Sequence, residues 1–423
     1  MNKCSVQLSW VLSAVLLATI FLFGIRWGTN ILSKGPVYDE QYITVPIDNL
    51  IKYGWSVSTA INFEETKGPA MIWPYAIIGN FFGGTLNDLR LVSVWSSIFA
   101  AAFLAWLALL RSVRPKLIIW ITLGWLLLPY NLIFSEIVMG EVSYLLLALM
   151  AVSAFVFGVG SPVNKSKWIA PTLYCIALAL ALHSRIHVVA VAGAVCLTAF
   201  GLQGKSSWPW WLATFVAGLL RIPLWYHWGG LVSPQYQALH GLGFRLESLS
   251  YLAAAMVPFV GIFALEGWRR VKARPSIMMA FIVGFFLVII AMPDLYVPET
   301  IDLTANNSRF QGIAATLVKK ISSELLVQQI TLALLAGLGL SGLIGLWHCR
   351  DKATLLTSLT FWSMLLGWSL YALTRGFVFD RFLLTWAFLL PILWVQLLPR
   401  GLRCVQYAGL AFIAAYLAAI WLN

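Results

Sequence analysis

Charge is scarce in this chain. Only 10% of its 423 residues are Asp, Glu, Lys or Arg, and only 16 residues are acidic. A mean hydropathy of +0.85, 21 tryptophans and repeated long apolar runs do not fit a soluble domain. The composition therefore predicts a membrane protein in which little of the chain lies outside the bilayer.

The sequence also lacks the marks of a modular protein. It has no low-complexity segment, no clear internal repeat and no polar stretch long enough for a separate soluble domain. We expect one membrane-embedded domain over residues 1–423, with sizeable outer loops at residues 26–87, 226–248 and 294–325.

Long apolar runs recur along the whole chain. A helical span needs roughly 20 apolar residues to cross a hydrocarbon core of about 30 Å, and backbone groups in lipid must be satisfied within the protein. We therefore predict an all-α, polytopic helical bundle with about 11–13 spans. The thirteen predicted spans cover residues 8–25, 88–110, 117–134, 142–158, 169–184, 187–202, 208–225, 249–267, 276–293, 326–347, 354–373, 382–398 and 405–422.

The stretch 69–83 is apolar but short, and it contains Pro69 and Pro74. We predict that it lies in the outer interface as a helix and does not cross the membrane. If it crossed, every later loop would change sides and the distribution of charge would invert.

Basic residues set the orientation of the bundle. With the N-terminus in the cytoplasm, the cytoplasmic segments hold 15 of the 28 basic residues but only two of the 16 acidic ones, Glu266 and Asp351. The basic excess thus reflects topology and the anionic inner leaflet, so it does not indicate nucleic-acid binding.

Cysteine and histidine patterns point to no metal centre. The five cysteines lie in predicted spans or on the cytoplasmic side, which excludes an outer disulfide framework, and they lack metal-type spacing. His183 and His187 are one helical turn apart, but no third ligand accompanies them. We interpret them as histidines at a helix end that faces the headgroups.

Three short motifs in and after the first outer loop form a pattern. They are the acidic pair Asp39-Glu40 after the first span, the stretch Lys67-Gly68-Pro69-Ala70-Met71-Ile72-Trp73, and Asn87-Asp88-Leu89-Arg90 at the entry to the second span. This pattern resembles the polytopic C-type (GT-C) glycosyltransferases, nearest to the protein O-mannosyltransferases and the lipid A aminoarabinose transferases.

The resemblance is strongest over residues 1–200, and the segment 374–399 is similar to the family's late arginine-aromatic approach to a span. Two features depart from the family. The usual Lys-Pro-Pro is Lys67-Gly68-Pro69 here, and no C-terminal soluble domain is visible.

The resemblance implies sugar transfer from a polyprenyl-phosphate carrier to an acceptor hydroxyl on the extracytoplasmic side, with inversion. Such a reaction needs a carboxylate at the water–lipid boundary to take the proton of the acceptor. Asp39 matches the family's catalytic acid, and Glu40 is the reserve. The structural alternative is an ordinary loop acid that pairs with Arg26 or Lys34.

The reaction also needs cations that hold the phosphate. Lys67 matches the family's motif lysine, although an interface lysine that snorkels to the headgroups is the common alternative. Arg375 and Arg381, which flank a short outer loop, complete the predicted clamp, and Arg185 is a further candidate.

Three other residues are candidate substrate ligands or neighbours of the site. Glu141 begins the fourth span, where the family places an acid that lines the sugar site, although the helix dipole alone could explain a carboxylate there. Glu136 is a weaker candidate in the same turn. His240 lies on an outer loop that could cover the carrier.

The predicted partners are a polyprenyl-phosphate-linked sugar donor, membrane lipid, and a glycolipid, polysaccharide or protein acceptor, with no nucleic acid. The resemblance leaves a divalent cation near Asp39 open and assigns no metal ligands. The predicted location is a bacterial inner membrane, with the site facing outside.

Two other classes compete with this prediction. A transporter or lipid-linked-sugar flippase would bury ionisable residues near the bilayer midplane and often shows repeated halves, and neither feature is visible here. An O-antigen-type polymerase would carry arginine-rich outer loops, whereas the outer face here is slightly acidic.

Overall fold

The computed structural model describes residues 3–37, 39–56, 58–59, 67–160, 168–234, 242–295, 310–374 and 376–421. The fold is the expected all-α, polytopic bundle: 82% of the chain is helical, and the described part holds a single pair of two-residue strands. The number and length of its apolar helices make the protein an integral multi-pass membrane protein.

The helices divide into two groups along the chain. Those of the first half are α1 (Lys3–Gly28), α2 (Glu40–Tyr53), α4 (Trp73–Phe82), α5 (Leu86–Leu110), α6 (Ile118–Leu126), α7 (Asn131–Phe134), α8 (Glu141–Gly160), α9 (Ile169–Ser184), α10 (Val189–Gln203), α11 (Trp208–Leu219) and α12 (Ile222–Trp228). Those of the second half are α13 (Leu246–Ala255), α14 (Val257–Val260), α15 (Ile262–Trp268), α16 (Arg274–Ile290), α17 (Ile313–Ile321), α18 (Leu325–His348), α19 (Thr354–Leu370), α20 (Leu384–Ala387), α21 (Leu390–Leu397) and α22 (Arg400–Trp421). The strands β1 (Phe310–Gln311) and β2 (Val378–Phe379) pair in parallel.

The number of continuous spans is lower than predicted. In the described part, eight helical stretches are long and apolar enough to cross a membrane, or up to ten if each of two bent pairs counts as one span. The bends lie inside predicted spans: α13–α14 meets α15 at 73°, and the segment Asp380–Ala387 meets α21 at 67°. Two further apolar helices, Pro115–Leu126 and Ile169–Ser184, are shorter.

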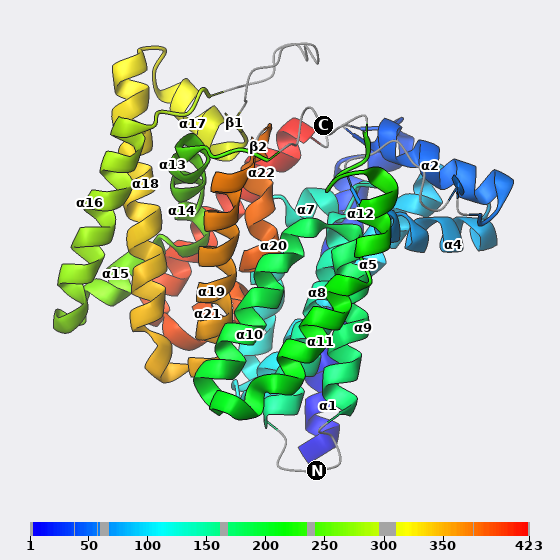
Figure 1. Ribbon diagram of the computed structural model, residues 1–423, viewed down its shortest axis with the longest axis horizontal. Coiled ribbons are helices and arrows are strands. Elements are labelled where there is room, and N and C mark those ends of the chain that lie inside the picture. Colours follow the sequence, from blue (N-terminus) through cyan, green and yellow to red (C-terminus); the bar gives the residue numbers. More distant parts are fainter. Residues whose placement is uncertain are drawn as a thin grey trace.

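Two other differences reduce the number of continuous spans. The predicted span 117–134 breaks after α6, because Tyr130 adopts a left-handed φ of 67° and a new helix begins at Asn131. The predicted spans 187–202 and 208–225 fall within one apolar stretch, Ile186–Trp228, although Figure 1 shows α10 and α11 as separate helices side by side.

Helices α2 and α4 run across the direction of the long helices (Figure 1). The residues of α2 that are buried recur at helical spacing, as in Ile43, Pro46, Ile47 and Leu50, and this face packs on α4. Residues 69–83, for which an interfacial placement is predicted, form a short 3₁₀ turn followed by α4.

Glycines on α18 allow the second half of the bundle to pack closely. A Cβ atom on Gly339 would lie 1.9 Å from the Ala253 carbonyl oxygen, and one on Gly345 would lie 2.1 Å from the carbonyl oxygen of Phe263. Small residues at such crossings let helix backbones approach in a membrane. The bent unit α13–α15 is thereby held against a straight span.

The bundle has two chemically different ends. The turn before α16 and the turn after α18 are basic and lie together, since Arg270 contacts Asp351 at 3.4 Å and Lys352 contacts Glu266 at 3.5 Å. We call this the basic end. The two acids that the sequence assigned to the cytoplasm are thus partners of its basic residues. The other end, which carries α2, α4, α7 and α17 (Figure 1), is called the acidic end.

Candidate functional site

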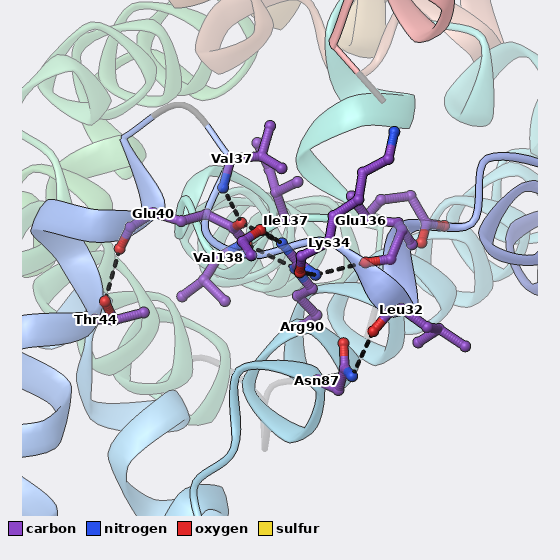
Figure 2. A network of polar contacts seen from close by, with 12 residues as sticks. Leu32, Lys34, Val37, Glu40, Thr44, Asn87, Arg90, Glu136, Ile137 and Val138 are labelled. Carbon is purple, nitrogen blue, oxygen red and sulfur yellow. Dashed lines mark hydrogen bonds and ion pairs between the residues drawn. The ribbon is translucent and has the colours of Figure 1, made fainter. Parts of the chain in front are cut away.

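The three motifs of the sequence meet at the acidic end around Arg90, in the first turns of α5. The Arg90 side chain is fully buried and donates to both carboxylate oxygens of Glu40, at 3.0 and 2.6 Å, and to the carbonyl oxygens of Ile31, Lys34 and Gly35. Figure 2 shows this network. It fixes the segment that leads into α2 on top of α5.

Glu40 is part of the scaffold. Besides the pair with Arg90, its carboxylate accepts hydrogen bonds from the backbone N–H groups of Val37 and Val138, both at 2.7 Å. The side chain is 0% exposed. A carboxylate held by four donors is not placed to accept a proton from an acceptor hydroxyl. This geometry favours a positioning role for Glu40 over the predicted role of reserve catalytic acid.

Asp39 differs from Glu40 both in its hydrogen bonds and in its exposure. It stands at the N-cap of α2 but makes no capping hydrogen bond, and its side chain is 34% exposed. Its Oδ2 lies 3.6 Å from Nη2 of Arg381. Of the two predicted alternative partners, Arg26 contacts Glu136, and Lys34 offers its carbonyl oxygen to Arg90.

Arg381 comes from the far end of the chain and is buried. It lies in the 3₁₀ turn after β2, with its guanidinium 4.4 Å from the Phe379 ring centroid and 5.9 Å from that of Phe134. Aromatic faces favour a cation in a desolvated position. The neighbouring Asp380 accepts hydrogen bonds from Tyr130 and from the N–H of Ala314, so the same turn also anchors the start of α17.

Glu141 and Arg185 form a second buried ion pair, and Arg185 lines the same cavity as Arg381. Nη2 of Arg185 donates to Oε1 of Glu141 at 2.5 Å, and both side chains are less than one tenth exposed. Glu141 also interacts electrostatically with Lys67 and Arg381. The predicted site residues Asp39, Lys67, Glu141, Arg185 and Arg381 are therefore brought together from distant parts of the chain.

Lys67 is buried rather than snorkelling, since only 2% of it is exposed. Its placement depends on the glycine that follows it. The N–H of Gly68 donates to the Ser184 carbonyl oxygen at 2.8 Å, and a Cβ there would lie 1.7 Å from the carbonyl oxygen of His183. This close approach to the end of α9 explains why the chain cannot carry the proline that the family has at position 68.

A small cavity of about 130 Å³ lies beside these residues. Three arginines line it, Arg185, Arg221 and Arg381, together with His187 and aromatic side chains. Arg221 was not predicted. It is 2% exposed, and within the described part of the chain its Nε and Nη1 atoms have no hydrogen-bond partner. An arginine between apolar residues of a predicted span was the available signal.

His183 and His187 both make hydrogen bonds within the bundle. The His183 ring bonds to the Ala179 carbonyl oxygen at 2.8 Å, and Nε2 of His187 lies 2.6 Å from the Tyr371 hydroxyl. In the described part of the chain no three His, Cys, Asp or Glu side chains gather in a way that could hold a metal.

Glu136 lies outside the cation cluster. It is fully buried beside Arg26, with 3.6 Å between Oε2 and Nη1. Burial raises the pKa of this carboxyl to about 8, while Arg26 and Arg90 act in the opposite direction. Two other predicted residues, His240 and Arg375, lie outside the described residues.

Comparison with known proteins gives one structural likeness. No protein-family model matches the chain, and no curated protein matches it. Among solved structures, it is similar to the crystal structure of ArnT from Cupriavidus metallidurans in the apo state, with 14% identity over 94% of this chain and 76% of that chain, and a TM-score of 0.44. ArnT is a lipid A aminoarabinose transferase and a C-type glycosyltransferase.

Proposed function

We propose that the protein is a membrane glycosyltransferase that moves a sugar from a polyprenyl-phosphate carrier to an acceptor hydroxyl at the acidic end of the bundle. The observation that carries this proposal is the contact between Asp39 and Arg381. It joins a partly exposed carboxylate, which can meet an acceptor, to a buried group of cations, which can hold a phosphate.

Among the described residues, the site holds more cationic than acidic side chains. Arg185 is paired with Glu141 and Arg381 with Asp39, and Lys67 acts on the same Glu141. Arg221 lies over the Trp225 ring, and its Nε and Nη1 atoms have no hydrogen-bond partner among the described residues. An excess of buried positive charge is costly unless an anion compensates it. A phosphate is the anion that suits several guanidinium groups, because each guanidinium can donate two hydrogen bonds to it.

In the proposed reaction, the acceptor oxygen attacks the anomeric carbon as the bond from that carbon to the phosphate oxygen breaks. Asp39 takes the proton of the acceptor hydroxyl. The polyprenyl phosphate leaves with the electron pair of the broken bond, and Lys67 and the arginines stabilise the charge that develops on it. Attack opposite to the leaving group inverts the configuration at the anomeric carbon.

A lateral groove supports a lipid-linked donor. An apolar cavity of about 550 Å³ lies between α4 and α5, lined by side chains such as Phe82, Leu91, Trp95 and Phe99. Its inner wall includes Ser96, which bonds to Ser143 at 3.2 Å, two residues after Glu141. A prenyl chain in this groove would enter from the bilayer beneath α4 and bring its phosphate toward the cation cluster.

The location of the charge argues against a transporter. The buried ion pairs of Glu40 and Glu141 lie at the acidic end, in the loops and first turns of α5 and α8, away from the middle of the spans. Transporters place such groups near the midplane. With the basic end in the cytoplasm, the site faces outside, and a bacterial inner membrane is the proposed location.

The test compares cells that carry the wild-type protein, Asp39→Asn or Asp48→Asn, with envelope glycolipids, polymers and proteins analysed by mass spectrometry. Asp48 is an acid on the same helix without a role in the site, so its variant is the matched control. We expect one sugar mass to disappear from one component with Asp39→Asn only. Transfer by an inserted Asp39→Asn protein would refute the proposal.

A further inference from the structure

The basic end of the bundle carries more cations than its own acids can pair with. Six basic and two acidic residues lie in the segment that joins α15 to α16 and in the turn after α18, residues 266–274 and 350–352. Glu266 contacts Arg269 at 3.3 Å and Lys352 at 3.5 Å. Asp351 contacts Arg270 at 3.4 Å. The other three cations form no ion pair in the described part of the chain: Lys272, Arg274 and Arg350.

Two of these three cations rest on tryptophan rings. The Arg274 guanidinium lies 6.0 Å from the Trp268 ring centroid, and its Nε donates to the Trp268 carbonyl oxygen at 2.9 Å. The guanidinium of Arg350 lies 4.3 Å from the Trp347 ring centroid. An arginine that stacks on an aromatic ring keeps the N–H groups at its edge available for an anion. Both guanidinium groups are therefore oriented and still have donors to offer.

A contact between α16 and α18 brings the two arginines to one junction. Nε2 of His348, in the last turn of α18, lies 2.7 Å from the Ser276 hydroxyl, in the first turn of α16. Arg350 follows His348 by two residues, and Arg274 precedes Ser276 by two residues. Lys272 lies in the turn before α16 and is exposed. We call the surface formed by Lys272, Arg274 and Arg350 the basic corner.

Apolar side chains are exposed beside the basic corner. Leu265, Trp268 and Val271 are between 42% and 68% exposed. They belong to α15 and the turn after it, and α15 bends by 73° from α13–α14. A short segment that exposes both apolar and basic side chains is typical of a membrane interface, where apolar groups enter the acyl region and cations lie among the headgroups. The basic corner therefore lies at the level of the lipid phosphates.

The helix that begins at the corner faces hydrocarbon. Only 22% of the residues in the apolar window of α16 are buried. Met278 and Met279, about one turn after Arg274, are 46% and 61% exposed. A ligand at the corner thus meets cations at one end and an apolar helix face next to them. A soluble anion would use only the cations, whereas a phospholipid complements both surfaces.

We propose that the basic corner binds an anionic phospholipid. The phosphate accepts hydrogen bonds from Arg274 and Arg350, with Lys272 beside the headgroup, and an acyl chain lies along the exposed face of α16. A zwitterionic lipid brings its own cation to this place, so the excess positive charge selects an anionic one. The bound lipid joins the turn before α16 to the turn after α18 and thereby stabilises the bent unit α13–α15.

The experiment measures lipid binding to the purified full chain. Native mass spectrometry counts retained dilauroyl phosphatidylglycerol, with dilauroyl phosphatidylcholine as the zwitterionic comparison. The test variant is Arg274→Gln/Arg350→Gln, which removes two exposed charges from the corner. The matched control is Arg114→Gln/Lys116→Gln, which removes two exposed charges from the turn before α6. The two variants therefore change the net charge of the protein equally.

We expect the wild type to retain phosphatidylglycerol in preference to phosphatidylcholine. The variant Arg274→Gln/Arg350→Gln should lower retained phosphatidylglycerol by about tenfold, and the control should leave it unchanged. Equal retention by the two variants would show that phosphatidylglycerol responds only to net charge. That result, or a wild type without preference for phosphatidylglycerol, would overturn the site.

A second variant leaves the arginines in place. Val271 is 68% exposed, so Val271→Glu adds a negative charge beside the corner without opening a cavity. It should lower retained phosphatidylglycerol even if the loss of two arginines disturbs the turn. Retention as in the wild type would contradict the proposal. Inorganic phosphate should not displace the lipid, and displacement would show that the corner binds a free anion instead.

Thermal unfolding in detergent tests the stabilising role. Added phosphatidylglycerol should raise the unfolding temperature of the wild type and of Arg114→Gln/Lys116→Gln, but not that of Arg274→Gln/Arg350→Gln. An equal rise in all three proteins would refute this role. The corner lies at the opposite end of the bundle from Asp39, so Asp39→Asn should respond to the lipid as the wild type does. The lipid site and the proposed function can therefore fail separately.

Discussion

Oδ2 of Asp39 and Nη2 of Arg381 lie 3.6 Å apart, although the two residues come from opposite ends of the chain. Because this distance exceeds that of a hydrogen bond, the contact orients Asp39 without engaging it fully. Asp39 is 34% exposed and Arg381 only 7%. The pair therefore joins a proton acceptor at the surface to an anion site in the interior.

We predict that Asp39 and Arg381 act as one unit. Asp39→Asn and Arg381→Gln should each lower kcat/KM by about two to three orders of magnitude, and the double variant should lose little more than either single variant. The measurement is a double-mutant cycle on the initial rate of transfer. Fully additive losses would show that the two residues act independently.

The adjacent acids Asp39 and Glu40 should differ in how much the corresponding amide substitution lowers stability. Glu40→Gln leaves Arg90 as a buried charge without its partner, which costs about 3–5 kcal/mol. Asp39→Asn removes a 3.6 Å contact of a partly exposed carboxylate, and such contacts contribute about 0–1 kcal/mol. We therefore expect a clearly lower unfolding temperature in detergent for Glu40→Gln and a much smaller decrease for Asp39→Asn. The reverse order would return Glu40 to the reactive site.

The class and the bundle were predictable, and so were most residues of the candidate site, because the relevant signals are local. Apolar runs of span length identify membrane helices, and the motifs around Asp39, Lys67 and Arg90 are short. The distinction between Asp39 and Glu40 was not predictable. It depends on which carboxylate points at Arg90 and Val138, and these residues lie in other segments of the chain.

The breaks inside apolar runs were not predicted. Pro258 and Gly261 lie at the bend between α14 and α15, and Pro391 lies in the first turn of α21 after the second bend. Such residues are common where helices bend, but hydropathy alone does not show whether they bend a span. The bend at Gly261 is supported by contacts with α18, which the local sequence does not contain. Arg221, by contrast, carried a usable signal: a cation within an apolar run.

Gly68→Ala should displace Lys67. The added Cβ would overlap the His183 carbonyl oxygen, so the segment must move away from the end of α9. We expect weaker donor binding, measured as a higher KM for the lipid-linked sugar. Gly35→Ala is the control, since a Cβ at Gly35, in the same outer loop, meets no atom within 4 Å. Equal KM values for the two variants would contradict this role of Gly68.

Stability should depend on pH through Glu136. Its pKa is raised from 4.5 to about 8 by burial, so between these values the folded state binds more protons than the unfolded state. The stabilisation is complete below about pH 4.5 and is lost as pH rises through about 8. Unfolding temperatures should therefore fall across this range in the wild type and vary less in Glu136→Gln. The same slope in both proteins would assign the effect to another group.

The substitution Arg221→Met tests whether Arg221 binds the donor phosphate or supports the fold. The guanidinium is buried, and two of its nitrogens make no hydrogen bond within the described residues, so an apolar side chain of similar length should maintain or raise the unfolding temperature. If Arg221 holds the donor phosphate, the same change should raise KM for the lipid-linked sugar by about tenfold. A protein that is destabilised but keeps its KM would show instead that Arg221 supports the fold. Stability gained and donor affinity lost in one variant would mean that the excess charge of this cavity is maintained for the substrate.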